Sequence, residues 1–491
     1  MLGDWEHQTD GIRFGSGQKN VYLNWGMGSG KTRAAISIAR DSNVVVIVCP
    51  ISVAPAWVRA FAECDPSRRV ISAYSGSSAI RAKRIAAAGP GRVAVIINYD
   101  SVWRRGLADS IEKLAIDHII LDEAHRAKSP GGRAARYLYR LAIKHRDARR
   151  LCLSGTPCPH SPMDLYAQYR FLDASVFGTS FATFRARYAI PHPMFASANV
   201  GYRNQSELAA KIQPTQHTVD TDAVLTLPDA IHTRIDVPLT RDESNFYLSM
   251  AATLVAQVGG GEVSATNVLT QLLRLQQACS GHTTVDGENV RLNGATNATS
   301  KGAALADWMA DLPASSPLVV FCRFREDLAQ VHLAAIANKR ESLELSGTVN
   351  ELAEWQGGAG TVLAVQIASG GVGIDLTRAS HCAFLSLGFS LGEFEQALAR
   401  IRRPGARSTC RYYHFLASID ATSATVDDLV YRALRDRRAV IDTVLDGVKL
   451  ATGDGNASRF FAKERSDCGF NATAGGKKRT NNSSRVDRSA G

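Results

Sequence analysis

The chain alternates short runs of β-branched residues with helix-like segments, and it does so in two separate series. Between residues 20 and 157 the apolar runs are VYLNW, VVVIVCP, RVAVIINY, HIILDE and RRLCLSG. A second series begins near Pro317 and contains PLVVFCRF, SLELSG, TVLAVQ, HCAFLSL and CRYYHFL. Strands that alternate with helices form parallel sheets covered on both faces. The pattern therefore predicts an α/β fold with two lobes.

Helical periodicity prevails between the two series, in DLYAQYRFL, SNFYLSMAATLVAQV and NVLTQLLRLQQAC. After about Ala451 the composition changes to Gly, Asn, Ser and Lys, which cannot bury enough apolar surface to become ordered. The length of 491 residues allows about three folding units at roughly 150 residues each. We therefore expect lobes at 1–158 and 301–450, helical insertions and a linker at 159–300, and a flexible basic tail at 451–491.

Composition favours a soluble globular protein that attracts polyanions. The 57 Lys and Arg residues exceed the 46 Asp and Glu residues, and the net charge of +11 suits nucleic acid or acidic lipid as well as simple solubility. None of the nine cysteines forms a C-x-x-C pair, so we expect no zinc site and a reducing compartment. Because the longest apolar stretch, Val44 to Val58, contains two prolines and is too short for a membrane helix, we expect an intracellular protein outside the membrane.

The strongest single motif is GMGSGKT at residues 26–32, which stands between VYLNW and the helix-like RAAISIAR. The backbone N–H groups of Gly28, Ser29 and Gly30 can close around phosphate oxygens. Lys31 supplies a positive charge to the β- and γ-phosphates, and Thr32 offers its hydroxyl to Mg²⁺. The motif predicts an ATP and Mg²⁺ site, although Trp25 occupies the position of the usual first glycine.

Two adjacent carboxylates, Asp122 and Glu123, follow the apolar run HIIL and precede His125. A buried strand that ends in this way provides one acid to hold Mg²⁺ and one to polarise the attacking water, as phosphoryl transfer requires. Alone, the tetrapeptide DEAH could be a solvated helix cap. Its place after a phosphate-binding loop in the same lobe favours a catalytic pair, with Asp122 on the metal and Glu123 on the water.

Two segments of the second lobe carry candidate phosphate contacts. ASGGVGIDL at 368–376 follows a strand and has glycines suited to close approach by a phosphate, with an ordinary Gly-rich turn as the equal alternative. In FEQALARIRRPGA, Gln396, Arg400 and Arg403 recur at i, i+4 and i+7, so we expect them to share one helical face. An arginine placed there can neutralise charge on the transferring phosphoryl group, whereas the alternative is a solvated basic helix.

These motifs resemble, in their order, those of superfamily 2 helicases and translocases, and specifically the Swi/Snf-like branch that moves along double-stranded DNA. The resemblance extends from about Trp5 to about Leu450. It implies two tandem RecA-like lobes with helical insertions between them and ATP in the cleft. It also implies an adenine contact for Gln8, phosphate-site roles for Gly373 and Asp375, and catalytic roles for Arg400 and Arg403. Coupling or nucleic-acid contacts are implied for Pro50, Asn98, Tyr99, His125, Ser154, Thr156, Arg323 and Gln396.

The sequence thus predicts an ATP-dependent motor that travels along duplex DNA, mainly through contacts to phosphates. We expect a monomer, a minimal motor without further domains, and no membrane partner. Two alternatives remain open: a strand-separating DNA or RNA helicase of the same superfamily, and a DNA-binding scaffold without catalytic activity. Intact Lys31, Asp122, Glu123 and Arg403 argue against the scaffold.

Overall fold

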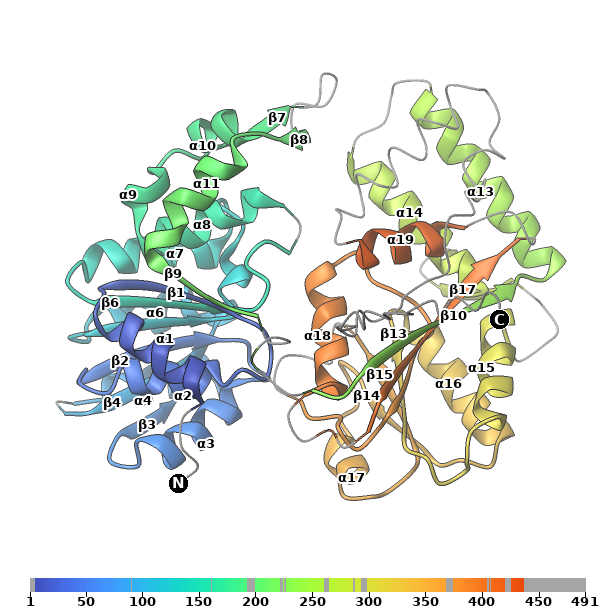
Figure 1. The fold of residues 1–491 in the computed structure, drawn as a ribbon, viewed down its shortest axis with the longest axis horizontal. Helices are drawn as coiled ribbons and strands as arrows, with labels where there is room; N and C mark the ends of the chain where they lie inside the picture. Colours follow the sequence, from blue (N-terminus) through green and yellow to red (C-terminus); the bar gives the residue numbers. More distant parts are fainter. Residues whose placement is uncertain are drawn as a thin grey trace, which may run out of the picture.

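The structure is a computed structural model that describes residues 5–89, 91–159, 161–191, 199–220, 224, 227–259, 265–285, 288–292, 298–367, 374–403, 406, 408–419 and 425–436. Figure 1 shows two α/β lobes side by side, the first drawn in blue to green and the second in green to red. Gly373 and the expected tail at 451–491 lie outside the described residues. Among the helices that are described, none is long and apolar enough to cross a membrane.

The first lobe is built on a sheet of seven parallel strands in the order β3-β4-β2-β5-β6-β1-β9. Every residue of β2, β4 and β5 is buried, as in a parallel sheet with both faces covered. The five strands expected here are confirmed. The strands are β1 (Asn20–Trp25), β2 (Val44–Cys49), β3 (Arg69–Ser72), β4 (Val93–Asn98), β5 (His118–Asp122), β6 (Arg149–Ser154) and β9 (Gln216–Val219).

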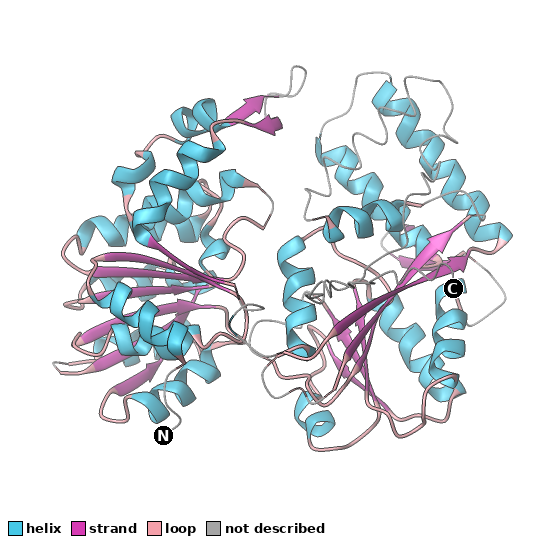
Figure 2. Ribbon diagram, viewed as in Figure 1, coloured by secondary structure: helices cyan, strands magenta, loops and turns pink. Residues whose placement is uncertain are grey.

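Helices pack on both faces of this sheet (Figure 2), and each face has its own apolar core. The core on one face includes residues of α1 (Glu6–Ser16), α2 (Lys31–Ile38) and α3 (Ala54–Cys64). The core on the other face includes residues of α4 (Ser78–Ala86), α5 (Tyr99–Val102), α6 (Arg105–Glu112), η1 (Ala124–Ala127), α7 (Arg133–Lys144) and α8 (Leu165–Leu172).

The helical insertion of the first lobe continues after α8 and then returns to the sheet. It contains η2 (Pro162–Asp164), α9 (Ala174–Phe177), α10 (Phe181–Tyr188), the hairpin β7 (Ala189–Pro191) and β8 (Asn199–Tyr202), α11 (Gln205–Ile212) and η3 (Gln213–Thr215). The range 159–300 was expected to be helical insertions and linker. Two of its strands, β9 and β10 (Ala230–Pro238), instead pair with β1 and β17 and extend the two sheets.

The second lobe has six parallel strands in the order β10-β17-β16-β13-β15-β14. Its expected strands are confirmed as β13 (Leu318–Cys322), β14 (Ser342–Leu345), β15 (Val362–Gln366), β16 (His381–Phe384) and β17 (Cys410–Ser418). The core on one face includes residues of α13 (Arg241–Gly259), α14 (Ala265–Cys279), α17 (Leu352–Gln356), α18 (Leu391–Ile401) and α19 (Val426–Arg435). The other core includes α15 (Ser300–Ala310) and α16 (Arg325–Ala337), and a hairpin of β11 (His282–Val285) and β12 (Glu288–Arg291) follows α14.

A buried ion pair fastens α15 to α19 in the second lobe. The Lys301 ammonium donates to Asp427 Oδ2 at 2.5 Å and to the Leu385 carbonyl oxygen at 2.8 Å, and Lys301 is 1% exposed. Burial is the largest single influence and disfavours the charged ammonium, but the charge and hydrogen bond of Asp427, together with Cys279 and Asp327, raise the pKa of Lys301. The ammonium therefore stays charged inside the lobe, and its bond to Asp427 fixes how α19 lies on the sheet.

We predict that Lys301→Ala destabilises the second lobe by about 3 to 5 kcal/mol, because the Asp427 carboxylate would stay buried without its cation. The exposed pair of Lys144 and Glu112, with nitrogen and oxygen 3.0 Å apart, provides the control, and Lys144→Ala should cost less than about 1 kcal/mol. Urea unfolding followed by tryptophan fluorescence measures both. Equal losses in the two variants would contradict the assigned role of the buried pair.

Candidate active site between the lobes

The loop between β1 and α2 has a backbone that only glycine adopts readily. Gly28 and Gly30 have φ angles of 77° and 79°, in the left-handed region, and Gly30 is the N-cap of α2. A Cβ atom on Gly30 would lie 1.9 Å from Gln8 Nε2. The loop therefore turns tightly at the positive end of the α2 dipole, where backbone N–H groups can receive an anion.

Side chains of α1 and β1 support this loop. Gln8 Nε2 donates to the Ser29 carbonyl oxygen at 3.1 Å, and Gln8 Oε1 accepts from the Trp5 backbone N–H at 3.0 Å. Gln8 is 4% exposed, so its amide supports the loop, and its contact with adenine stays a prediction. Trp25, the departure from the usual glycine, is fully buried and donates to His217 Nδ1 of β9 at 2.9 Å.

Lys31 begins α2 and Thr32 follows it in the same first turn. The Lys31 ammonium donates to the carbonyl oxygens of Trp25 at 2.7 Å and Gly26 at 3.0 Å. Burial lowers the pKa of Lys31, and the nearby carboxylates of Glu123 and Asp122 oppose the shift. The phosphate-binding lysine and the carboxylate pair thus lie within electrostatic range of each other, as the sequence predicted from separate motifs.

The two carboxylates stand at the carboxyl end of β5. The Trp57 indole N–H donates to Asp122 Oδ2 at 2.8 Å, and the Glu123 backbone N–H donates to Asp122 Oδ1 at 3.0 Å. Burial, followed by the charge of Glu123, raises the pKa of Asp122 to about 6. Burial also raises the pKa of Glu123, while Lys31 and Arg400 act in the opposite direction. The surrounding cations therefore offset much of the cost of burying two acids.

Glu123 has a left-handed backbone, with a φ angle of 51°, which is uncommon for a residue with a side chain. This conformation ends β5 and starts η1 within one residue. Such backbone strain persists only where the surroundings fix it, and it concentrates at functional sites. Here the turn leaves the Glu123 side chain 2% exposed and next to the cations of the cleft.

Arg400 reaches the site from α18 of the second lobe. It is 5% exposed, and its Nε and Nη2 atoms have no hydrogen-bond partner within the described parts of the chain. Burial lowers the pKa of Arg400 to about 10, and Glu123 of the first lobe opposes the shift. Because a buried guanidinium without hydrogen bonds is costly, its free donors indicate a place for an anion. Both lobes therefore contribute charges to one site.

Arg403 differs from the expected arrangement. It was predicted to share one helical face with Gln396 and Arg400, but α18 ends at Ile401 and Arg403 lies beyond it. Its Nη1 atom donates to the Ile374 carbonyl oxygen at 3.2 Å and lies 4.0 Å from Asp375 Oδ2. The residue that follows it is Pro404, which disfavours helical backbone at the preceding position. The shared face is therefore limited to Gln396 and Arg400.

A chain of polar contacts leads from Glu123 to the second lobe. His125 Nδ1 lies 3.3 Å from Glu123 Oε2 and 3.0 Å from the Ser154 hydroxyl oxygen, which also accepts from the Thr156 backbone N–H at 3.1 Å. A Cβ atom on Gly392 of α18 would lie 3.4 Å from Thr156 Oγ1. Three of the residues predicted to couple ATP state to movement, His125, Ser154 and Thr156, are therefore joined by hydrogen bonds, and Thr156 lies close to the backbone of α18.

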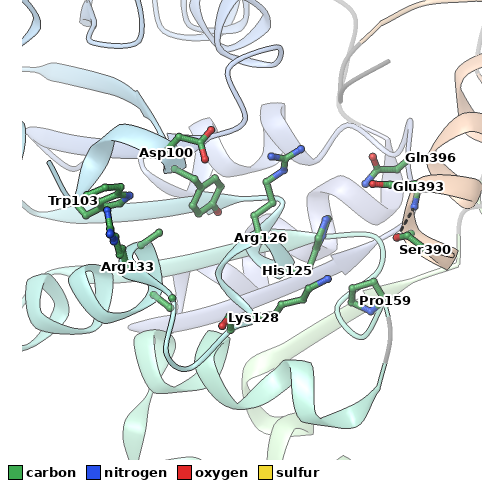
Figure 3. Close-up of a pocket in the computed structure, with 16 residues that line it drawn as sticks. Asp100, Trp103, His125, Arg126, Lys128, Arg133, Pro159, Ser390, Glu393 and Gln396 are labelled. Atoms are coloured by element: carbon green, nitrogen blue, oxygen red, sulfur yellow. Dashed lines mark hydrogen bonds between the residues drawn. The ribbon is translucent and has the colours of Figure 1, made fainter. Parts of the chain in front are cut away.

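A cavity of about 490 Å³ lies beside this chain of contacts and between the lobes. Figure 3 shows His125, Arg126 and Lys128 on the first-lobe side and Glu393 and Gln396 on the second-lobe side. Arg133 of α7 also lines the cavity, and its guanidinium carbon lies 4.9 Å from the centre of the Trp103 ring. The basic run HRAKSPGGR is the sequence signal for Arg126, Lys128 and Arg133, which were not among the predicted nucleic-acid contacts.

The other predicted nucleic-acid residues make contacts within the protein. Pro50 is buried after β2, the Asn98 side chain accepts from the Ser101 hydroxyl, and the Tyr99 hydroxyl donates to the Asp122 carbonyl oxygen at 2.9 Å. The Arg323 guanidinium donates to Gln276 Oε1, and its carbon lies 4.2 Å from the centre of the Phe389 ring. Direct contacts of these residues with nucleic acid stay predictions.

Comparison with known proteins decides the family. A profile described as the SNF2-related domain matches residues 14–284, which is more than half of the chain. The chain belongs to the SNF2-related family. This finding confirms the resemblance to the Swi/Snf-like branch, and the two parallel sheets confirm the predicted fold class.

Similar proteins come from phage and animals. The chain is 24% identical over 462 residues to "Putative protein p41" of Acyrthosiphon pisum secondary endosymbiont phage 1, covering 88% of this chain and 95% of that protein. It is 25% identical over 442 residues to "DNA annealing helicase and endonuclease ZRANB3" of Mus musculus, covering 86% of this chain and 39% of that protein. It is 30% identical over 207 residues to "DNA excision repair protein ERCC-6-like" of Danio rerio, covering 38% and 14%. The chain therefore spans well under half the length of these animal relatives.

Among solved structures, the protein is similar to the "Sulfolobus solfataricus SWI2/SNF2 ATPase core in complex with dsDNA". The TM-score is 0.40 and the identity is 18%, with 94% of this chain and 97% of that chain covered.

We predict that Gly30→Ala lowers the affinity for a fluorescent ATP analogue by at least about tenfold, because left-handed backbone costs a residue with a Cβ roughly 1–2 kcal/mol. The new methyl group would also displace Gln8. Gly131→Ala is the matched control, since a Cβ atom there meets nothing within 4 Å. Titration of the analogue by fluorescence anisotropy measures both variants, and unchanged affinity in Gly30→Ala would contradict the assignment of the loop.

Proposed function

We propose that this protein hydrolyses ATP in the cleft between its lobes and uses the hydrolysis to move along duplex DNA. The observation that carries the proposal is the buried Arg400 of the second lobe, whose Nε and Nη2 atoms have no partner among the described residues and which lies within electrostatic range of Glu123 and Lys31. A site that needs groups from both lobes makes hydrolysis depend on their relative position. Such dependence converts a chemical step into domain movement.

The first lobe binds the nucleotide. The N–H groups of the glycine-rich loop and the Lys31 ammonium hold the β- and γ-phosphates, and Lys31 leaves its two loop carbonyls to do so. Thr32 and Asp122 would hold Mg²⁺, which neutralises phosphate charge when bound. These oxygen ligands fit the ion, because magnesium takes one or two protein oxygens and completes its shell with water and phosphate.

Glu123 and Arg400 perform the catalytic step. A Glu123 carboxylate oxygen orients the attacking water and accepts its proton, and the raised pKa of Glu123 suits a base for this step. The free Nε and Nη2 donors of Arg400 bond to the oxygens of the transferring phosphoryl group, where negative charge builds up. We propose that Arg403, which lies near Asp375 at the end of the glycine-rich segment, also helps to neutralise charge on the transferring phosphoryl group.

The contacts through His125, Ser154 and Thr156 transmit the change. When Glu123 loses the phosphoryl group beside it, the hydrogen bonds from His125 to Ser154 rearrange, and Thr156 shifts against Gly392 of α18. Hydrogen bonds join His125, Ser154 and Thr156, and Thr156 lies close to Gly392 of α18, so a shift at one end of this path can reach the second lobe.

Three observations support DNA as the polymer along which the protein moves. The net charge is +11, the cavity between the lobes carries Arg126, Lys128 and Arg133, and the ZRANB3 and ERCC-6-like relatives have names that refer to DNA. Contacts through such cations go mainly to phosphates and are weakly sequence-specific. We further propose that the protein acts as a monomer inside the cell. A strand-separating helicase on DNA or RNA is the second candidate, which the shared motifs equally permit.

We predict that duplex DNA stimulates ATP turnover more than single-stranded DNA or RNA. Arg400→Ala should lower kcat on the order of 10³-fold while ATP binding is kept, because the arginine acts on the transition state. Arg402→Ala is the control, since the Arg402 guanidinium donates to the Pro228 carbonyl oxygen at 2.8 Å. Turnover is measured as the ATPase rate with no nucleic acid, with duplex DNA, with single-stranded DNA and with RNA. ATP binding is measured by equilibrium titration of the ATP analogue. Normal turnover in Arg400→Ala would contradict a site shared by the lobes.

We also predict that DNA affinity falls steeply with salt, by a slope of about −0.9 per phosphate contacted. Arg133→Ala should weaken binding to all sequences alike and reduce the slope by about one. Arg146→Ala, at an exposed position near the other end of α7, should leave the slope unchanged. Fluorescence anisotropy at several salt concentrations provides the slopes.

A strand-displacement assay separates the two candidate functions. A duplex translocase displaces the third strand of a triplex without opening duplex DNA. ATP-driven opening of duplex DNA or RNA would instead favour the helicase.

A further inference from the structure

The first turn of α18 carries an acidic residue that faces the first lobe. Glu393, Gln396 and Arg400 stand at i, i+3 and i+7, so they share one face of the helix. Arg400 at one end of this face lies near Glu123, and Glu393 at the other end lines the cavity opposite Lys128 and Arg126 (Figure 3). The same helical face thus reaches both the catalytic acid and the cavity.

Charges of both lobes meet at Glu393. Lys128 of the first lobe is partly buried, which lowers its pKa, and Asp164 and Glu393 are the carboxylates that oppose the shift, whereas Arg126 adds to it. Burial lowers the pKa of Arg323 of the second lobe, and Glu393 is the carboxylate that opposes this shift most strongly. Because Arg323 is fixed by Gln276 and the Phe389 ring, it holds the second-lobe side of this group in place.

The backbone of α18 lies close to the first lobe at the same point. A Cβ atom on Gly392 would lie 3.2 Å from Pro159 Cβ and 3.4 Å from Thr156 Oγ1. A side chain on Gly392 would require these neighbours to move by a few tenths of an ångström, which indicates a close approach of the helix backbone to the first lobe. It makes the docking of the first turn sensitive to any force that pulls α18 toward or away from the first lobe.

We propose that Glu393 is a positioning residue whose attraction to Lys128 across the cavity docks α18 on the first lobe and so sets Arg400 against Glu123. Glu393 does not touch the nucleotide site itself. It acts through the helix, by stabilising the closed arrangement in which the site is complete. The effect on hydrolysis rests on the proposed ATPase function, whereas the effect on closure does not.

The test measures closure directly, by energy transfer between dyes attached through non-natural amino acids at exposed Ile143 of α7 and exposed Ile336 of α16. Glu393→Gln and Lys128→Met should each reduce the closed population, and the charge exchange Glu393→Lys with Lys128→Glu should restore it. Glu395→Gln is the matched control, because Glu395 is on the same helix but lines a different cavity, with His232 and Tyr431. It should leave closure unchanged.

Steady-state kinetics provide the second readout. Glu393→Gln should raise the KM for ATP about three- to tenfold, while kcat at saturating ATP changes less, because ATP itself favours closure. The difference from the parent protein should shrink at high salt, which screens a charge pair but not a packing defect. Failure of the charge exchange to restore closure, or an equal effect of Glu395→Gln, would overturn the proposal. If closure responds as expected but no ATP is hydrolysed, the proposed function fails and the role of Glu393 stands.

Discussion

The rest of the structure depends on the attraction between Arg400 of the second lobe and Glu123 of the first lobe, beside Lys31. A buried guanidinium whose Nε and Nη2 atoms lack partners among the described residues and a buried carboxylate with a raised pKa are each unfavourable alone. Across the cleft they offset each other, and together they leave donors free for an anion. The two lobes are therefore joined at the place where neither lobe is electrostatically satisfied by itself.

Parallel sheet topology brings the first-lobe groups to that place. The strands β1, β5 and β6 are neighbours, and their carboxyl ends carry the phosphate-binding loop, the carboxylate pair and the Ser154 turn. Motifs as far apart in the sequence as Lys31 and Ser154 thus meet at one edge, which is the usual ligand site of open α/β sheets. The left-handed backbone of Glu123 then turns the chain directly from β5 into η1. Sheet order positions these groups, and local backbone conformation orients them.

The sequence predicted what local patterns can encode. Buried strands such as β2 and β5 are continuous apolar runs in the sequence. Asp122 and Glu123 stand at the end of β5, and Lys31 stands at the start of α2, where their chemistry requires them. The edge strands β9 and β10 were not predicted from the sequence. Strand β9 has only four residues, and β10 alternates between half-buried and exposed positions. The helical period predicted Arg403 on the same helical face as Arg400, but α18 ends at Ile401, so the two share no face although the charge of Arg403 still acts on Arg400. The Trp57 contact with Asp122 joins residues 65 positions apart, so no local pattern could reveal it.

The most direct test of the shared site is a structure with ADP, Mg²⁺ and aluminium fluoride bound together with duplex DNA. The account predicts that the Arg400 guanidinium and the Lys31 ammonium contact the fluoride group from opposite lobes, at about 3 Å, with Glu123 on the attacking water. Arg400 turned to solvent, with Lys31 still bonded to the carbonyl oxygens of Trp25 and Gly26, would contradict it.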